Sequence, residues 1–390
     1  MPRQRILIGH PFVHPSGGGN AVAAWAIQAL QRDYHVTVAT LGPIPKEAVD
    51  RSFGTSLAAR DFEILIAPPR YQRILRAKDA LRTNGALLEA SLTARWVRSL
   101  DREHRFDALL HTQNEADLGR PGLQYIHFPA FYLPRPEIEM RPVHRIPGIL
   151  WLYRKSCYPS LDATMSAIRR NQSLVNSEFV AGATRRVLGG DPVVLHPPVP
   201  GDFPEKPWDE RRNGFLGIGR IHGCKRWDMA VQIVDALRHS GHDVTLTIAG
   251  HPDDPAKKQE LDDLAATRPW FRILTDLSRR ELEAEAASHR YGIHAMEAEH
   301  FGIAVAELQR AGCITFVHNS GGPVEIVGRD PRQTFENVED AAHKISRVLA
   351  SPELAAELRA LTLARRELFS TDRFCESLCG IVARFIEDHP

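Results

Sequence analysis

The stretch YGIHAMEAEHFGIAVAELQRAGCITFVHNSGGP, residues 291–323, joins two short apolar runs through a longer segment of different periodicity. The runs at 291–296 and 313–319 are rich in β-branched and aromatic residues and predict strands. The apolar spacing over 302–311 predicts a helix between them. Two strands separated by one helix of this length form a parallel crossover unit. The stretch therefore predicts an α/β protein with parallel sheets.

Runs of the same two kinds alternate along most of the chain. Further strands are predicted at 5–10, 35–41, 62–68, 106–112, 123–129, 213–220, 243–250 and 271–277, and further helices at 21–33, 225–240, 257–267, 279–289 and 369–389. Strands that alternate with helices of this length form parallel sheets with helices on both faces. We expect two Rossmann-like, doubly wound sheets.

The segment HPPVPGDFPEKPWDERR, residues 196–212, separates the two series and contains five prolines. Proline at this density continues neither a helix nor a central strand, so the segment predicts a linker. We expect domains at 1–198 and 213–368, a linker at 199–212, and a final helix within 369–390 that packs back on the first domain. Two such sheets are expected to face a cleft at the carboxyl ends of their strands, where α/β sheets bind ligands.

The composition excludes several classes of protein. The chain has 49 basic and 48 acidic residues, so there is no electrostatic reason to expect a nucleic-acid partner. No stretch resembles a signal peptide or a run of about 18 apolar residues, and the five cysteines are scattered. We expect a cytoplasmic protein without a disulfide framework. Cys375 and Cys379 share a helix face, where core packing is expected rather than a metal site.

Two basic stretches leave a membrane contact open. Residues 141–161 mix basic residues with Ile, Leu, Trp and Tyr, which is typical either of a helix buried between domains or of peripheral docking on an anionic bilayer. We favour the buried helix. Residues 70–82 predict a solvated basic helix.

Glu307 stands out because it falls inside the apolar arc of the helix predicted at 302–311. That arc spans about 140° at 3.6 residues per turn. A buried carboxylate has to be paired or has to bind a ligand that donates hydrogen bonds. Two interpretations stay open, a structural ion pair with an arginine and a contact with ligand hydroxyl groups.

The residues before Glu307 favour a ligand. Phe301, Gly302 and Ile303 open the helix and leave backbone N–H groups that suit a phosphate. Glu299 precedes this turn, and Glu307 lies about 8–12 Å further along at 1.5 Å per residue. A diphosphate at the helix start would then have one carboxylate near each of two flanking sugar rings, as in a nucleotide-sugar site.

Cationic residues after another predicted strand fit the same ligand. In GIGRIHGCKRW, Gly219 leads into a strand-to-helix turn that carries Arg220 and Lys225. Paired cations can stabilise a diphosphate leaving group without a metal ion. A solvated basic turn is the alternative. The sequence has no Asp-x-Asp pair to hold a divalent ion, so we expect no metal cofactor.

The first domain offers candidate ligand contacts at two strand ends. Gly17, Gly18 and Gly19 form a strand-to-helix junction where backbone amides can approach a ligand, with a simple tight turn as the alternative. The junction lacks the G-x-G-x-x-G spacing of dinucleotide-binding folds. His127, in YIHFP, follows a predicted strand and is expected at the same edge of the sheet.

The combination of motifs resembles glycosyltransferase family 4, whose members are retaining enzymes of the GT-B fold. EHFGIAVAE matches the Glu-x7-Glu motif of that family, and GGG, VNSEF (175–179), GRIHGCK and SGGPVEIV occur in matching order. YIHFP, HPPV, IHAMEAEHFGIAVAE and HNSGGP resemble in particular the α-1,2-mannosyltransferase type that extends dolichol-linked oligosaccharides. The chain differs from that type in being shorter and in lacking an N-terminal membrane helix, which argues against a dolichol acceptor.

The resemblance assigns expected roles to these residues. It implies that Glu307 binds the ribose hydroxyls, that Glu299 binds the donor sugar, and that the acceptor lies near the glycines at 17–19. The diphosphate would be held by Arg220, Lys225 and the amides of Phe301, Gly302 and Ile303, with Gly219 beside them. His127 would contact the donor sugar or the acceptor.

The resemblance implies transfer of a hexose, first mannose from GDP-mannose, to a glycan, glycolipid or small metabolite. A transferase of natural-product or cell-envelope biosynthesis that uses UDP-glucose or UDP-N-acetylglucosamine is the alternative. A nucleotide-sugar epimerase and a non-catalytic sugar-nucleotide sensor are further alternatives, and the Glu-x7-Glu motif argues against the epimerase.

Overall fold

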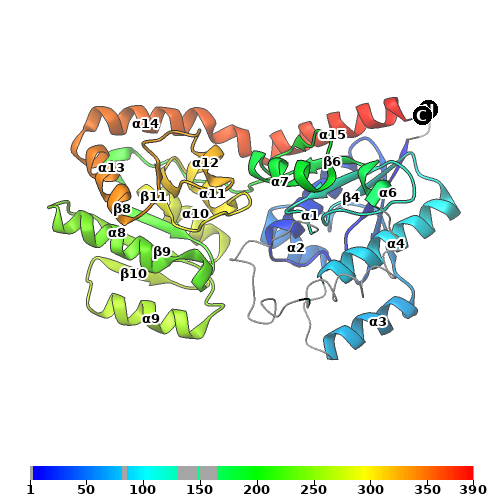
Figure 1. Cartoon of the computed structure of the whole chain (residues 1–390), viewed down its shortest axis with the longest axis horizontal. Helices are drawn as coiled ribbons and strands as arrows, with labels where there is room; N and C mark the ends of the chain where they lie inside the picture. The colour runs from blue at the N-terminus through cyan, green and yellow to red at the C-terminus, as the bar shows by residue number, and fades with distance from the viewer. Residues whose placement is uncertain (1–2, 81–85, 131–147, 149–164, 390) are drawn as a thin grey trace. The chain divides into compact units, whose positions relative to one another are not determined.

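The computed structural model describes residues 3–80, 86–130, 148 and 165–389. The chain divides into two compact units (Figure 1). Unit 1 comprises Met1–Pro198 and Thr371–Pro390, and unit 2 comprises Val199–Ser370. The basic and apolar stretch at 141–161 lies outside the described residues except for residue 148.

The sheet of unit 1 has seven strands among the described residues, in the order β3-β2-β1-β4-β5-β6-β7, and every strand pair is parallel. The strands are β1 (Arg5–Gly9), β2 (His35–Thr40), β3 (Glu63–Ile66), β4 (Ala108–His111), β5 (Leu123–Ile126), β6 (Gln172–Val175) and β7 (Val193–Val194). The helices are α1 (Gly18–Leu30), α2 (Lys46–Phe53), α3 (Pro69–Ala80), α4 (Ala86–His104), α6 (Met165–Arg169), α7 (Glu178–Leu188) and α15 (Thr371–Asp388).

Strand β1 shows why helices cover both faces of this sheet. Successive side chains of a strand point to opposite faces. Ile6 and Ile8 belong to the core that α1 and α15 complete, whereas Leu7 belongs to a second core with α4. Because Ile6, Leu7 and Ile8 are all apolar, the strand has to be buried on both sides.

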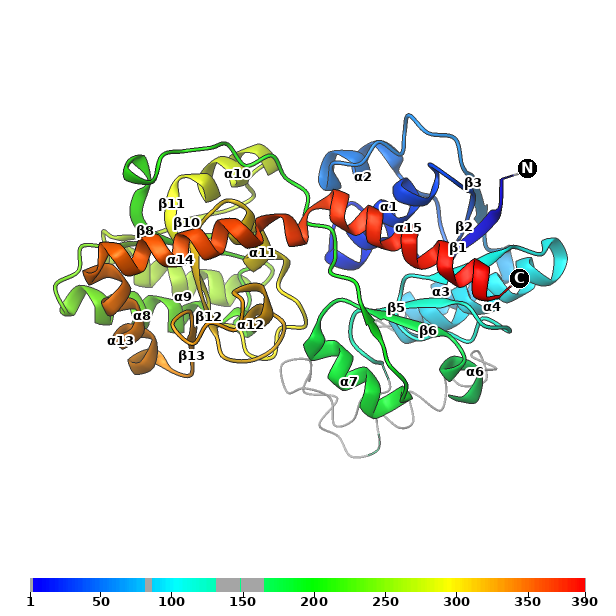
Figure 2. The same ribbon diagram turned by 90° about the horizontal axis from the view of Figure 1, so that it is seen from above.

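Helix α15 contributes a large part of the first of these cores. Figure 2 shows it running alongside α1. Its buried residues Phe374, Leu378 and Phe385 join the same cluster as the side chains of α1. Cys375 is buried in this cluster and Cys379 packs against it, as expected for thiols that fill core space.

The sheet of unit 2 has six parallel strands in the order β10-β9-β8-β11-β12-β13. They are β8 (Arg212–Ile218), β9 (Thr245–Ala249), β10 (Phe271–Leu274), β11 (His289–His294), β12 (Ile314–His318) and β13 (Thr334–Phe335). The helices are α8 (Trp227–His239), α9 (Pro255–Ala266), α10 (Arg279–Ala287), α11 (Ile303–Arg310), α12 (Pro323–Ile326), α13 (Val338–Ala350) and α14 (Pro352–Arg365).

Helices cover both faces of this sheet as well. In β8, Phe215 packs into a core with α8 and α13, whereas Leu216 packs into another with α10 and α11. The two parallel sheets confirm the predicted Rossmann-like fold class. No helix within the described ranges is both long and apolar enough to cross a membrane.

The segment predicted as a linker at 199–212 is more ordered than its prolines suggest. Val199 donates a backbone hydrogen bond to Phe369 at 3.1 Å, so the segment starts within unit 2. A short 3-10 helix covers Trp208–Glu210, and Arg212 is already the first residue of β8. The prolines of this segment all lie before Trp208, so regular structure begins directly after Pro207.

Leu378→Ala should destabilise unit 1. Leu378 is 1% exposed, and truncating a buried leucine costs about 2–5 kcal/mol. Hydrogen exchange followed by mass spectrometry should show faster exchange in α1 and unchanged exchange in β8. Glu376→Ala, at an exposed position of the same helix, is the control. Unchanged protection of α1 in the Leu378 variant would contradict the packing described.

Candidate functional site

The loops that follow β8, β11 and β12 form the candidate site of unit 2. All three strands are parallel, so their carboxyl ends lie at one edge of the sheet. The loops contact one another through backbone. A Cβ atom added to Gly321 would lie 2.3 Å from the Glu299 carbonyl oxygen, and one added to Gly322 would lie 2.5 Å from that of His300. The glycines of NSGGP therefore allow the loop after β12 to pack on the loop after β11.

Glu299 and Lys225 meet in this site from different loops. The Lys225 Nζ atom donates to Glu299 Oε2 at 2.5 Å, and both side chains are largely buried. His294, at the end of β11, places Nε2 3.7 Å from the same oxygen. Burial alone would raise the pKa of Glu299, but His294 and Lys225 hold that pKa well below its usual range. Glu299 is therefore ionised and holds the Lys225 ammonium in place.

Arg220 has a different partner in the structure. Its Nη1 atom donates to Asp253 at 2.8 Å, and its side chain is 62% exposed. Its backbone is fixed, because Trp227 Nε1 donates to the Arg220 carbonyl oxygen at 3.0 Å. Gly219 has a φ of 155°, and a Cβ atom on Gly250 would lie only 1.8 Å from the Gly219 carbonyl oxygen. The turn around Arg220 is rigid, whereas its side chain reaches outward to an acid.

Helix α11 begins next to these groups. Gly302 precedes it with a φ of 100° and a ψ of 63°, and its carbonyl oxygen accepts from the amides of Val305 and Ala306. The N–H groups at the start of a helix have no acceptor within the helix. Its first turn contains no acidic residue. The turn through Phe301, Gly302 and Ile303 is thus suited to an anion by geometry and charge.

Glu307 lies in α11 and is 7% exposed. Its Oε1 atom accepts a charged hydrogen bond from Arg279 Nη1. The arginine partner that the sequence left open is therefore present. Arg279 itself was not identified from the sequence, because it lies in another helix and nothing in its local spacing marks it.

In unit 1 the structure brings the glycine loop and His127 together. Gly17 has a φ of 86°, and α1 starts at Gly18. A Cβ atom on Gly19 would lie 3.3 Å from His127 Nε2. That ring nitrogen also lies 3.0 Å from the Thr112 carbonyl oxygen. Because a carbonyl oxygen only accepts, His127 Nε2 carries the proton and donates.

His10 is a residue of this region that sequence reasoning missed. It follows β1, is 2% exposed, and places Nε2 3.1 Å from Asn20 Oδ1 and Nδ1 2.9 Å from Thr112 Oγ1. Asn20 Oδ1 also accepts from the His14 amide, so His10 Nε2 is the donor. Burial lowers the pKa of His10 to about 3. A neutral histidine therefore ties the glycine loop to the end of the sheet.

A cavity of about 370 Å³ adjoins this loop within unit 1. Its lining combines two histidines, amides and one carboxylate with apolar side chains. The lining residues are His10, Pro11, Phe12, His14, Asn20, Leu75, Glu89 and Gln113.

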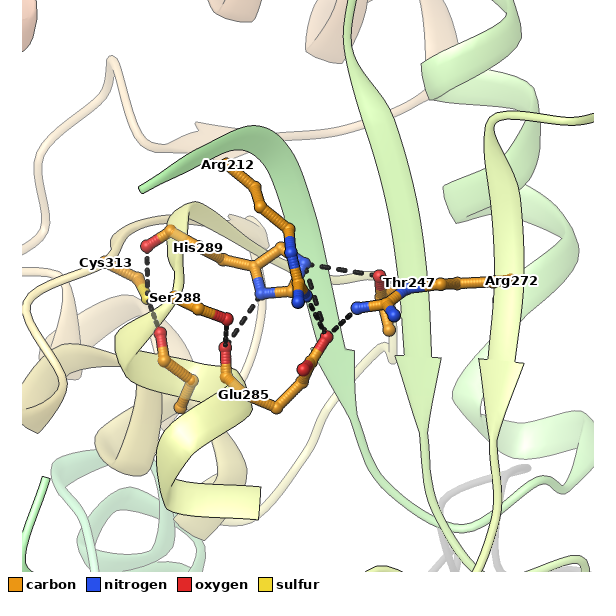
Figure 3. Close-up of polar contacts among 8 residues, drawn as sticks. Arg212, Thr247, Arg272, Glu285, Ser288, His289 and Cys313 are labelled. Atoms are coloured by element: carbon orange, nitrogen blue, oxygen red, sulfur yellow. Dashed lines mark hydrogen bonds and ion pairs between the residues drawn. The ribbon is translucent and has the colours of Figure 1, made fainter. Parts of the chain in front are cut away.

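A second charged cluster lies at the opposite edge of the unit 2 sheet (Figure 3). Glu285 of α10 accepts from Arg212 and Arg272, which belong to β8 and β10. His289 donates from Nδ1 to the Glu285 carbonyl oxygen at 2.8 Å, and its Nε2 lies 3.2 Å from Thr247 Oγ1. These groups satisfy one another where the strands begin, so the cluster is structural.

The chain is similar to known glycosyltransferases in sequence and in fold. Residues 200–362 match the family model described as glycosyl transferases group 1. The matched range contains the Lys225, Glu299 and Glu307 groups. The match covers most of unit 2. The chain resembles the crystal structure of a glycosyltransferase from Rickettsia africae ESF-5, with a TM-score of 0.67, 16% identity and full coverage of both chains. The two units thus have the Rossmann-like architecture of GT-B glycosyltransferases.

Curated relatives are mannosyltransferases. The chain is 28% identical over 182 residues to a GDP-Man:Man(3)GlcNAc(2)-PP-Dol alpha-1,2-mannosyltransferase of Dictyostelium discoideum. This match covers 43% of the chain and 35% of the relative. It is 23% identical over 362 residues to the Eremothecium gossypii protein of the same name, covering 82% of this chain and 60% of the relative. The chain thus spans between about a third and three fifths of the length of these relatives.

Gly322→Ala should disrupt the contact between the two loops. The added methyl group meets backbone atoms that cannot rotate away, and overpacking of this kind costs about 1–3 kcal/mol. Chemical denaturation of unit 2 should show the loss. Gly223→Ala is the matched control, because its methyl group meets no atom within 4 Å. Equal stability of the two variants would contradict the loop packing.

The stability of unit 1 should fall as the pH drops below 6.5, in part through His10. The unfolded histidine binds a proton below 6.5, whereas the folded one does so only near pH 3. Each such group contributes a slope of about 1.4 kcal/mol per pH unit between these values. Denaturation of His10→Gln between pH 4 and pH 7 should show a shallower slope than the parent. An identical slope would show that His10 titrates normally in the folded protein.

Proposed function

We propose that this chain is a retaining glycosyltransferase that moves a hexose from a nucleotide-diphosphate sugar to a hydroxyl group. The observation that carries the proposal is the convergence of Lys225, Glu299 and the start of α11 at one sheet edge, inside the matched glycosyltransferase domain. A cation, a carboxylate and the backbone amides at a helix start are the groups that a sugar diphosphate needs.

The proposed donor lies along α11. Its diphosphate accepts hydrogen bonds from the amides of Phe301, Gly302 and Ile303 and is neutralised by Lys225. Arg220 joins by exchanging Asp253 for a phosphate, a change that its exposed side chain permits. Glu299 accepts from hydroxyls of the transferred sugar, and Glu307 accepts from the ribose.

GDP-mannose is the proposed donor and a glycan or lipid-linked sugar the proposed acceptor. The names of the curated relatives, which describe transfer from GDP-Man to a dolichol-linked oligosaccharide, support both choices. In unit 1, His127 and the glycines at 17–19 are proposed to contact the acceptor or the transferred sugar. UDP-sugars are the alternative donors. Peripheral contact with a membrane would suit a lipid-linked acceptor.

The proposed reaction forms the new bond on the face that the nucleotide leaves. The acceptor hydroxyl oxygen attacks the anomeric carbon as its bond to the diphosphate oxygen breaks. The hydroxyl proton passes to that departing oxygen, so no side-chain base is required. Lys225 and the helix amides stabilise the charge that develops on the diphosphate. We propose that these groups suffice without a metal ion.

A thermal-shift panel of GDP- and UDP-sugars tests the donor assignment. GDP-mannose should stabilise the protein most, because a ligand that binds the folded state raises the midpoint according to RT ln(1 + [L]/Kd). Glu307→Ala should lose that shift and the turnover while its ligand-free fold is kept. Glu339→Ala, at an exposed position of unit 2, should behave like the parent.

The same panel includes the outcomes that oppose the proposal. Specific stabilisation by a UDP-sugar would replace GDP-mannose as the donor, and full turnover by Glu307→Ala would remove its ribose role. Lys225→Ala and Arg220→Ala should each lose turnover, and the parent should keep it in EDTA. NMR of the product distinguishes transfer with retention from epimerisation of the donor. Binding without any turnover would favour a sensor.

A further inference from the structure

We infer that Arg279 is a positioning residue of the donor site, which holds the Glu307 carboxylate in the orientation that the ribose contact needs. The inference rests on the proposed function for the role of Glu307. Arg279 is the first residue of α10 and lies outside the Glu-x7-Glu motif.

Glu307 needs a partner of opposite charge. Its side chain is 9% exposed, and a carboxylate removed from water takes up a proton unless a cation or several donors face it. Arg279 supplies that cation through Nη1 to Glu307 Oε1.

Arg279 is itself held at all three guanidinium nitrogens. Its Nε atom donates to Glu283 Oε1 at 2.6 Å, and its Nη2 atom donates to the Pro200 carbonyl oxygen at 2.5 Å. The guanidinium carbon lies 5.8 Å from the centre of the Phe203 ring. A Cβ atom on Gly201 would lie 2.6 Å from Nη2, so the chain passes close over the guanidinium. A planar group held at three nitrogens gives Glu307 one defined orientation.

The ion pair with Arg279 leaves Glu307 able to accept further hydrogen bonds. Two carboxylates, Glu283 and Glu307, face one guanidinium, and the pKa of Arg279 stays above its usual value because the attraction of these acids outweighs desolvation. Each carboxylate offers about four acceptor positions, and Arg279 uses one on Glu307. Glu307 therefore keeps acceptor capacity for ribose hydroxyls while it is paired. The ion pair and the ligand contact, which the sequence posed as alternatives, are compatible.

Arg310 provides a matched control. It lies in α11, donates to the Val199 carbonyl oxygen, and places its guanidinium carbon 5.6 Å from the same Phe203 ring. Arg310 thus holds the same segment of chain as Arg279 does. The ion pair with the Glu307 carboxylate, however, is made by Arg279. Arg310→Met should weaken the anchoring of 199–203 without moving the ribose contact.

The test compares donor KM and kcat of Arg279→Met, Arg279→Lys and Arg310→Met with those of the parent at pH 7. Loss of a charge-assisted contact should raise the donor KM of Arg279→Met at least about tenfold. The kcat should change much less, because the ribose lies away from the bond that breaks and its binding is shared by the ground state and the transition state.

The conservative variant and the control complete the design. Arg279→Lys should recover part of the affinity, whereas Arg310→Met should keep the parent KM. A donor KM of Arg279→Met that equals that of the parent, or an equal rise in the KM of Arg310→Met, would overturn the inference. If Glu307→Ala binds the donor normally, the ribose role fails instead, and that result is separate from the comparison among the arginine variants.

Discussion

An ionised side chain that is removed from water needs a partner of opposite charge, and this constraint organises the candidate donor site. Glu299 is paired with Lys225, and Glu307 is paired with Arg279. Each pair joins two segments that are distant in sequence, so the fold brings the charges together before any ligand binds. Each carboxylate also keeps acceptor positions that a ligand can use while the ion pair is intact. A site built in this way is stable when empty and ready to bind.

The fold class could be predicted because its signal is local. In both sheets, continuous apolar runs such as ILIG and FLGI follow from burial on two faces, and helices of ordinary length separate them. Elements with weaker local patterns were missed. Strand β6, with the sequence QSLV, has only two apolar side chains, and α4 carries charged residues along much of its length. Their burial comes from neighbours in the fold, which no local pattern records.

The sequence predicted those parts of the site that lie within a single loop or helix. The turn before α11 and the buried position of Glu307 followed from helix periodicity, and the structure places both as that periodicity requires. The partners of the site residues could not be predicted from the sequence. Arg279 and His294 reach the carboxylates from other elements, and Arg220 pairs with Asp253 because that acid follows the neighbouring strand β9. His10 was missed for the same reason, since its partner Asn20 lies in α1 and its partner Thr112 follows β4.

The return of α15 to unit 1 also has a consequence for synthesis of the chain on the ribosome. Unit 1 is begun first, yet Phe374, Leu378 and Phe385 belong to its core and are made after all of unit 2. The 172 residues of Val199–Ser370 take roughly 10–30 s to translate at about 5–20 residues per second. During this interval the apolar face of α1 lacks its cover. The later half of the chain therefore completes its core before the earlier half, and the nascent first unit is the part that needs protection from aggregation.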